Sequence, residues 1–291
     1  MIIWLASYPR SGNTLLRTML KKTLNIDSYS DEPSPKSIGF SKDLEREFGH
    51  LDFEGSWDSF YAWATTSDSI VFVKTHLPPR DQQPVIYVVR DGRRSIVSYQ
   101  KYHQSFFPEY SGGLWDLVLG VDYYGGWSEH YAAWNAGARK RLLLRYEDLV
   151  GAPEDAVNKV VDFIGRADVP SKWINSFEQL NKKNPLFFRQ GRIEWDNTPE
   201  WTKDLDGAFF HVHGDLMSDL GYVERSGVEA ARGGLTPDMI KLIELARSIQ
   251  SDRTHLAQVC RERLDVIDAL DRKIRNAGVL AKLRRLTAWA R

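Results

Sequence analysis

The sequence contains a single cysteine, Cys260, among its 291 residues. One thiol excludes an internal disulfide and a metal site built from several cysteines. The formal net charge is zero, so the chain as a whole has no positive excess that would favour nucleic acid as a partner. No apolar run approaches the roughly 20 residues of a membrane span, and the first apolar run starts at residue 2, too early for a signal peptide. These absences predict a cytoplasmic protein.

The composition is otherwise that of a folded globular chain. Hydrophobic residues make up 42% of the sequence, enough for a sizeable core. The length fits one large domain with an appendage, and we expect a domain over residues 1–230 and a helical tail over 235–291. Aromatic residues make up 12%, which suits a pocket for flat or apolar ligands, although large cores also use aromatic side chains.

The beginning of the chain reads as a strand, a tight loop and a helix. Residues 2–6, IIWLA, form a short apolar run, as in a parallel strand buried on both faces. Pro9 and Gly12 interrupt this run, and apolar residues then recur at 15, 16, 19 and 20, which is a helical face. Backbone N–H groups at such a turn, with a helix N-terminus behind them, make an anion site whose usual occupant is phosphate. The alternative is an ordinary strand-to-helix turn.

Side chains of this loop strengthen the predicted anion site. Arg10 contributes a positive charge, and Ser11 and Thr14 contribute hydroxyl donors. The loop of nucleoside-triphosphate enzymes ends in Gly-Lys-Ser/Thr, which places a lysine on the phosphates and a hydroxyl on magnesium. This loop has one glycine and no such lysine, so a P-loop kinase fits it poorly.

Two more predicted strands end in residues that can carry chemistry. Residues 69–73 run into KTHLP at 74–78, and residues 84–89 run into Arg90. Ligands of open parallel sheets bind beyond the carboxyl ends of the strands, so Lys74 and His76 are placed to reach the opening loop. A histidine at a strand end beside a lysine is a candidate general base.

A second anion site is predicted after Arg90. Ser98 follows eight residues later within a predicted helix, and the two side chains can converge on one anion. The alternative is a helix N-terminus at which Arg93 and Arg94 pair with Asp91.

The remaining segments complete a doubly wound α/β pattern with a parallel sheet. We expect a fourth strand over 141–145, a helix over 152–164, and a helix over 126–134. Residues 100–126, with paired glycines at 112–113 and 125–126, read as a long mobile segment of the kind that often serves as a lid.

The motifs resemble, in order, those of the cytosolic-type sulfotransferases that use 3′-phosphoadenosine-5′-phosphosulfate (PAPS). Residues 8–14, YPRSGNT, resemble the family's 5′-phosphosulfate loop, Tyr-Pro-Lys-Ser-Gly-Thr-Thr-Trp, with Arg10 in place of lysine and Leu15 in place of tryptophan. Residues 74–78 match its Lys-Thr-His-Leu-Pro motif at every position. Arg90 and Ser98 have the spacing of its 3′-phosphate motif.

Later segments extend the resemblance, which covers residues 2–222. Residues 146–149, YEDL, and 175–180, NSFEQL, are similar to the segments that supply the family's adenine contacts. Residues 187–191, FFRQG, resemble the loop Phe-x-Arg-Lys-Gly that closes on the 3′-phosphate, with Gln190 replacing the lysine. One positive charge of the family's pattern is therefore missing there.

The resemblance implies transfer of a sulfonate group from PAPS to an acceptor hydroxyl or amine, without a metal. His76 would take the acceptor proton, while Arg10 and Lys74 would stabilise the negative charge that develops. The implied nucleotide ligands are Arg10, Ser11, Gly12, Asn13, Thr14, Leu15, Arg90, Ser98, Tyr146, Phe177, Arg189, Gln190 and Gly191. The alternatives are a P-loop nucleotide-dependent kinase and a non-catalytic nucleotide-binding scaffold. The fold does not name the acceptor.

The tail lies outside the resemblance and has its own pattern. Thr236 and Pro237 form a good helix start, as cap and first helical residue. From Leu242 to Ile274 positions recur at alternating spacings of four and three, and eight of the ten are apolar. This predicts either a homo-oligomer through residues 240–275 or an amphipathic helix packed on the domain.

The end of the tail is basic. Beyond Asp271 there is no acidic residue, and seven Lys and Arg give a charge of +7, next to an apolar face that includes Trp289. Such an end predicts peripheral contact with an anionic membrane surface through residues 272–291, and with it a lipid-linked or glycan acceptor. The alternative is a solvated basic tail or a protein docking site.

Overall fold

The computed structural model of the chain describes residues 1–32, 41–107, 109, 111–166, 169–188, 195 and 198–252, and the single residues 256, 259, 263, 270 and 273. The chain divides into two compact units, Met1–Pro237 and Asp238–Arg291.

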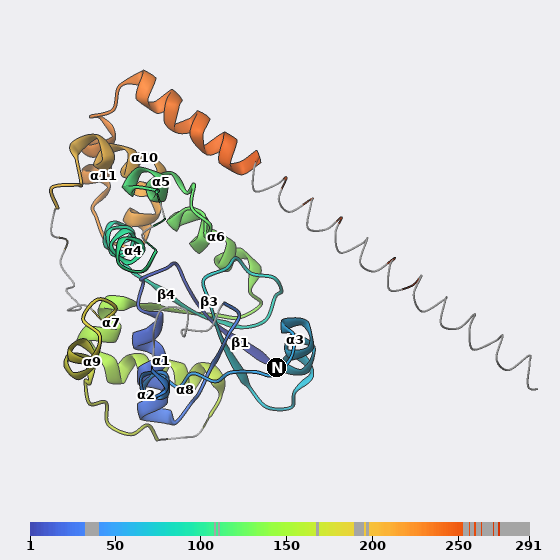
Figure 1. Cartoon of the computed structure of the whole chain (residues 1–291). Helices are drawn as coiled ribbons and strands as arrows, with labels where there is room; N and C mark the ends of the chain where they lie inside the picture. Colours follow the sequence, from blue (N-terminus) through green and yellow to red (C-terminus); the bar gives the residue numbers. More distant parts are fainter. Residues whose placement is uncertain are drawn as a thin grey trace, which may run out of the picture. The chain divides into compact units, whose positions relative to one another are not determined.

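A parallel sheet forms the centre of the first unit (Figure 1). In the described part of the chain it has five strands: β1 (Ile2–Ser7), β2 (Tyr29–Ser30), β3 (Val71–Thr75), β4 (Val85–Val89) and β5 (Arg141–Arg145). Their spatial order is β2-β3-β1-β4-β5, so β1 lies between β3 and β4. Ala6 of β1 is in register with Thr75 of β3 and Tyr87 of β4, and the carboxyl ends of all three strands therefore reach one edge.

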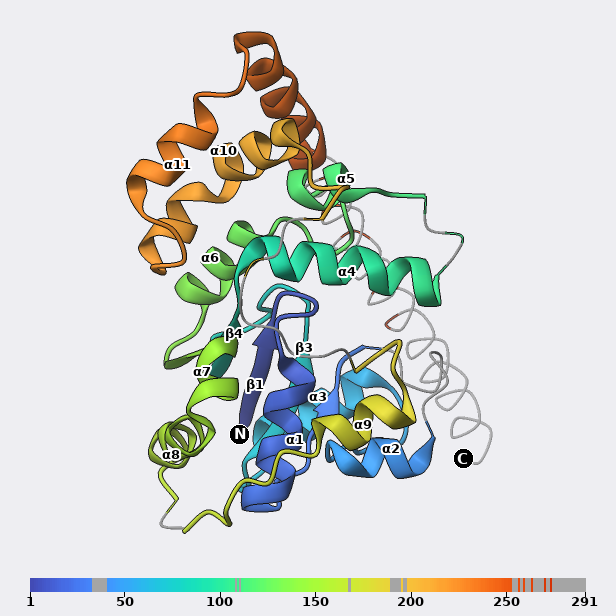
Figure 2. The ribbon, with the colours of Figure 1, turned by 90° about the vertical axis from the view of Figure 1, so that its left-hand side faces the viewer.

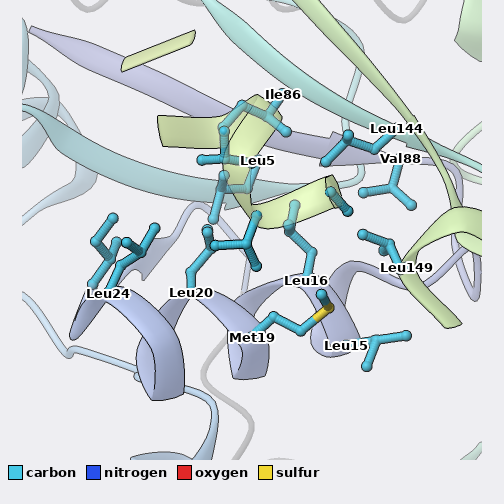
Figure 3. Packing of buried hydrophobic residues seen from close by; sticks show 14 of the residues in the cluster. Leu5, Leu15, Leu16, Met19, Leu20, Leu24, Ile86, Val88, Leu144 and Leu149 are labelled. Atoms are coloured by element: carbon cyan, nitrogen blue, oxygen red, sulfur yellow. The ribbon is translucent and has the colours of Figure 1, made fainter. Parts of the chain in front are cut away.

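Helices cover both faces of this sheet, which confirms the predicted α/β class (Figure 2). On one face, α1 (Asn13–Leu24) and α8 (Pro153–Ile164) pack against the strands. Figure 3 shows Leu16 and Leu20 of α1 directed at Leu5 of β1 and Ile86 of β4. All four side chains are at least 99% buried. Their burial removes water from the helix face that follows the opening loop, and so fixes where that loop lies.

On the opposite face, tryptophans make the principal contacts. The ring of Trp4 in β1 lies 6.1 Å from that of Trp134 in α6 (Trp127–Gly137) and 6.4 Å from that of Trp57 in α3 (Trp57–Thr66). Trp4 follows Ile3 and precedes Leu5, which both face the α1 side, because side chains alternate along a strand. The apolar run at residues 2–6 is therefore buried on both faces, as predicted.

The expectation of a long mobile segment over residues 100–126 is wrong for most of that range. Helix α4 (Gly92–Phe106) continues well past residue 100, and α5 (Leu114–Leu119) fills much of the remainder. The glycines mark helix ends: Gly113 precedes α5, and Gly120 ends it with a φ of 73°. Asp122, between α5 and α6, is buried and accepts from the hydroxyl of the buried Tyr99 of α4 at 2.8 Å, whereas Trp115 and Tyr123 are exposed.

The other helices of this unit complete its outer layers and their loops. They are α2 (Lys42–Glu47), α7 (Tyr146–Gly151), α9 (Phe177–Lys183), α10 (Lys203–Asp219) and α11 (Arg225–Arg232).

The tail is helical over residues 237–252, beginning at Pro237 as predicted. Positions of the predicted heptad stripe are exposed: the exposed fraction is 65% for Leu242, 52% for Ile249 and 60% for Leu256. The rest of the stripe, except for a few single residues, and the basic end over 274–291 lie outside the described residues. Among the helices that are described, none combines the length and the apolar character needed to cross a membrane.

Candidate active site

The loop between β1 and α1 is built as an anion site. Gly12 is the N-cap of α1, and neither a capping side chain nor an acidic residue in the first turn occupies the helix end. The N–H groups of Gly12, Asn13, Thr14 and Leu15 have no partner within the helix, because the first N–H groups of any α-helix lack one. These groups and the helix dipole together favour a bound phosphate or sulfate.

The loop backbone is held in an uncommon conformation. Arg10 has a φ of 63° and Gly12 a φ of 107°, both in the left-handed region that disfavours side chains. A Cβ atom on Gly12 would also lie 2.5 Å from Cδ2 of Tyr146. Two features therefore require a glycine at position 12: the left-handed φ and the close approach of the Tyr146 ring.

The Arg10 side chain leads away from the loop toward α4. Its Nη2 donates to the carbonyl oxygen of Phe187 at 2.7 Å, and its Nε donates to Oγ of Ser98 at 3.4 Å. The guanidinium also lies over the rings of Phe187 and Tyr102, at 4.7 and 5.2 Å. The structure thus joins two predicted site residues, Arg10 and Ser98, and ties them to the segment that carries Phe187.

Other side chains of the loop are hydrogen-bonded or packed within the protein. Oγ of Ser11 shares a hydrogen bond with Oγ of Ser95 at 3.1 Å, and Nδ2 of Asn13 donates to the carbonyl oxygen of Leu5 at 2.8 Å. Leu15 is 94% buried in the core on the α1 side of the sheet (Figure 3). It supplies no aromatic wall for a base, so the part of Leu15 and Asn13 that can face a ligand is the backbone N–H.

His76 lies just beyond β3, beside the end of β1. Its Nδ1 is 2.7 Å from the carbonyl oxygen of Ser7, so Nδ1 carries the proton and donates it, leaving the lone pair on Nε2. Burial, and then the positive charge of Lys74, lower the pKa of His76 well below its ordinary 6.5. The ring is therefore neutral at physiological pH, which is the state that a general base requires.

Helix α6 holds the segment that carries His76. Nε2 of His130 donates to the carbonyl oxygen of His76 at 2.9 Å, and Nδ1 of His130 accepts from the Tyr87 hydroxyl at 2.8 Å. The indole of Trp134 donates to the carbonyl oxygen of Leu77 at 3.0 Å. Burial lowers the pKa of His130 to about 4, so it stays neutral and serves as a structural link.

Lys74 is engaged by carboxylates that sequence reasoning missed. It forms an ion pair with Glu32, and Asp31 lies close enough to favour its charged form. Burial is the larger effect and lowers the pKa of Lys74 to about 7. Asp31 and Glu32 follow β2, whose two residues have no hydrophobic pattern; the only signal for them was an acidic pair ahead of a proline.

The second predicted anion site lies on the other side of the loop. Nη1 of Arg90 donates to the carbonyl oxygen of Arg10 at 3.2 Å, and the Arg90 guanidinium lies 4.2 Å from the centre of the Tyr146 ring. Arg90, Ser98 and Tyr146 thus meet around the opening loop. Of the remaining predicted ligands, Arg189, Gln190, Gly191 and the side chain of Phe177 lie outside the described residues.

The family follows from a direct match. Residues 2–207, more than half of the chain, match the model of the sulfotransferase domain. The chain therefore belongs to the PAPS-dependent sulfotransferases, enzymes that transfer a sulfonate group.

Individual proteins agree with this placement. The chain is 25% identical to the flavonol 3-sulfotransferase of Flaveria bidentis over 251 residues, which cover 70% of this chain and 79% of that protein. It is 30% identical to sulfotransferase 1A1 of Mus musculus over 165 residues, or 43% of this chain and 56% of that one. Its fold is similar to that of mouse sulfotransferase SULT7A1, solved with PAP, at a TM-score of 0.50 and 18% identity, covering 79% and 87% of the two chains.

The loop geometry predicts that Gly12→Ala weakens nucleotide binding by about tenfold or more. A left-handed φ costs a side chain about 1–2 kcal/mol, and the added Cβ would force Tyr146 or the loop to move. The measurement is calorimetric titration with adenosine 3′,5′-bisphosphate. Gly55→Ala is the matched control, since Gly55 has a φ of 82° but nothing within 4 Å of a Cβ. Unchanged affinity in Gly12→Ala would contradict the assignment of this loop.

Proposed function

We propose that the chain transfers a sulfonate group from PAPS to an acceptor hydroxyl or amine, with His76 as the general base. The observation that carries the proposal is the position of His76 beside the uncapped N-terminus of α1, with Nδ1 held by Ser7 and the lone pair on Nε2. A base and an anion site thus lie at the same edge of the sheet, which is what in-line group transfer from a bound anhydride requires.

The nucleotide has a place for each of its parts in this proposal. The 5′-phosphosulfate binds the N–H groups of residues 12–15 at the start of α1, because the N–H of Ser11 already donates to the carbonyl oxygen of Tyr8 at 3.2 Å. The 3′-phosphate binds Arg90 and Ser98, together with Arg189, Gln190 and Gly191. The adenine packs on Tyr146 and Phe177. The contacts of Arg10 with Ser98 and Arg90 support this arrangement, since they hold the two phosphate subsites next to each other.

The chemical step is a single displacement at sulfur. The acceptor oxygen or nitrogen forms a bond to sulfur while the bond from sulfur to the bridging oxygen breaks, and PAP leaves with that electron pair. Nε2 of His76 takes the acceptor proton. Lys74 and Arg10 stabilise the charge on the sulfonyl and bridging oxygens. With a pKa of about 7, Lys74 is only partly charged at neutral pH in the free protein. The negative charge of the bound phosphosulfate would raise this pKa and so favour the charged form of Lys74.

The proposed function is tested by incubating the protein with PAPS labelled in its sulfonate group and with cell extract, followed by isolation of labelled products. A sulfotransferase yields labelled acceptor and PAP with or without EDTA. A P-loop kinase would instead label products from γ-labelled ATP in an EDTA-sensitive way. A non-catalytic scaffold would bind PAPS and turn over neither nucleotide. Absence of labelled product across varied extracts would count against sulfonate transfer.

His76→Ala should reduce turnover by ~10²–10⁴-fold, the usual contribution of a positioned general base. Its affinity for adenosine 3′,5′-bisphosphate should stay within a few fold of the wild type, because the imidazole acts on the acceptor. Rates at saturating acceptor and calorimetric titrations measure the two quantities.

The pH profile of the wild type provides an independent check on His76. Protonation as the pH falls removes the base, and the lowered pKa of His76 places that loss below pH 6.5. An acid limb of kcat/KM at or above pH 6.5, or near-native turnover in His76→Ala, would show that another group is the base.

We propose further that the tail forms a homo-oligomer through residues 240–275. The exposure of Leu242, Ile249 and Leu256 on one heptad stripe supports a second copy as the partner. Its basic end over 272–291 would then contact anionic lipid. Sedimentation equilibrium and co-sedimentation with anionic or neutral liposomes test both points, comparing the full chain with one that ends at Asp271. A monomeric full chain contradicts the oligomer, and equal pelleting of the two chains contradicts the lipid contact.

A further inference from the structure

Arg94, on the first turn of α4, has no role in the site described so far. Asp91 caps this helix and is already paired: Arg93 donates to it from Nε at 3.2 Å and from Nη2 at 2.7 Å. Arg94 has no hydrogen bond or ion pair with any residue that the structure describes, and its Nε is buried without an acceptor. The sequence pattern that would pair both arginines with Asp91 therefore holds for Arg93 alone.

The position of Arg94 is that of a ligand-facing residue. Ser98 follows it by one helical turn, so the two share a face of α4, and Ser98 accepts from Arg10 of the opening loop. Arg90 precedes it by four residues and is bonded to the same loop residue. Arg94 thus lies, in sequence, midway between the two residues assigned to the 3′-phosphate, Arg90 and Ser98.

The surroundings of Arg94 contain charges of both signs. Burial and the positive charge of Arg90 lower the pKa of Arg94, while Asp91, Tyr146 and Glu147 raise it to a smaller extent. Neither carboxylate is hydrogen-bonded to the buried Nε of Arg94. An anion bound beside Arg90 and Arg94 would reduce the repulsion between the two guanidinium groups and accept from that Nε.

A cation on α4 suits the group proposed to bind there. A phosphate monoester carries a charge near −2 and is bound best when several cations surround it. Arg94 adds a second guanidinium group to that of Arg90, on the helix that carries Ser98.

We propose that Arg94 binds the 3′-phosphate of the nucleotide, adding a positive charge from α4 to that of Arg90. Arg94 is then a specificity-determining residue that makes the enzyme select nucleotides with a 3′-phosphate. This assignment rests on the proposed function, because it requires a 3′-phosphorylated nucleotide in the site.

The test compares the affinities for adenosine 3′,5′-bisphosphate and adenosine 5′-monophosphate by calorimetry. Arg94→Gln should reduce the preference for the bisphosphate by about tenfold or more and leave the affinity for the monophosphate within about twofold. Arg94→Lys should retain most of the preference. Lys101→Gln, at an exposed position on the same helix, is the control and should change neither affinity.

The outcomes separate the two levels of the proposal. A wild type without preference for the bisphosphate contradicts the proposed function itself. A wild type with that preference, together with full preference in Arg94→Gln, overturns the role of Arg94 alone. If Arg94→Gln binds neither nucleotide, Arg94→Lys decides: a preference within about threefold of that of the wild type supports the role of Arg94, and a larger loss of preference overturns it.

Discussion

The hydrogen bond between the His76 imidazole and the Ser7 carbonyl oxygen joins the ends of two neighbouring strands. Ser7 is the last residue of β1, and the opening loop starts directly after it, so the bond fixes the proposed base relative to that loop. It exists because β1 and β3 run parallel in register, with Ala6 beside Thr75. Helix α6 holds the same segment from the other side through His130 and Trp134. Burial of the two histidines, more than any neighbouring charge, keeps both rings neutral.

Charges around the site are divided between the two sides of the loop. On the β2 side, Glu32 and Asp31 balance Lys74, so that in the free protein this cation is matched by carboxylates and has a pKa near neutrality. On the α4 side lie three arginines, Arg10, Arg90 and Arg94, and Arg90 donates to the carbonyl oxygen of Arg10. In the proposed complex, a nucleotide with anionic groups at both ends would meet a lysine paired with carboxylates at one end and a group of arginines at the other.

Much of this arrangement could be predicted from the sequence, because strong local patterns determine it. The continuous apolar runs of β1, β3, β4 and β5 and the breaks at Pro9 and Gly12 are local signals, and they located the strands and the loop. β2 could not be found, since two residues at a sheet edge have no periodicity, and Asp31 and Glu32 were missed with it. The prediction of a mobile segment over residues 100–126 was wrong because glycines that end helices look the same in sequence as glycines of a mobile loop. The core position of Leu15 depends on which face of α1 is buried, and the structure gives that face. The sequence alone could not distinguish Arg94 from Arg93, because only the structure shows that Arg93 is the one bonded to Asp91.

Arg10 belongs to the proposed 5′-phosphosulfate loop and contacts two residues of the proposed 3′-phosphate subsite, Arg90 through its carbonyl oxygen and Ser98 through its side chain. In the proposed site, one residue in a left-handed conformation therefore sets the distance between the two subsites. The Tyr146 ring lies so close to Gly12 that a Cβ atom there would be 2.5 Å from its Cδ2, and this contact restricts movement of the loop. A site built in this way would distinguish nucleotides by the separation of two phosphates on one ribose, and an isomer with its second phosphate on the neighbouring hydroxyl would bring the correct charge to the wrong place.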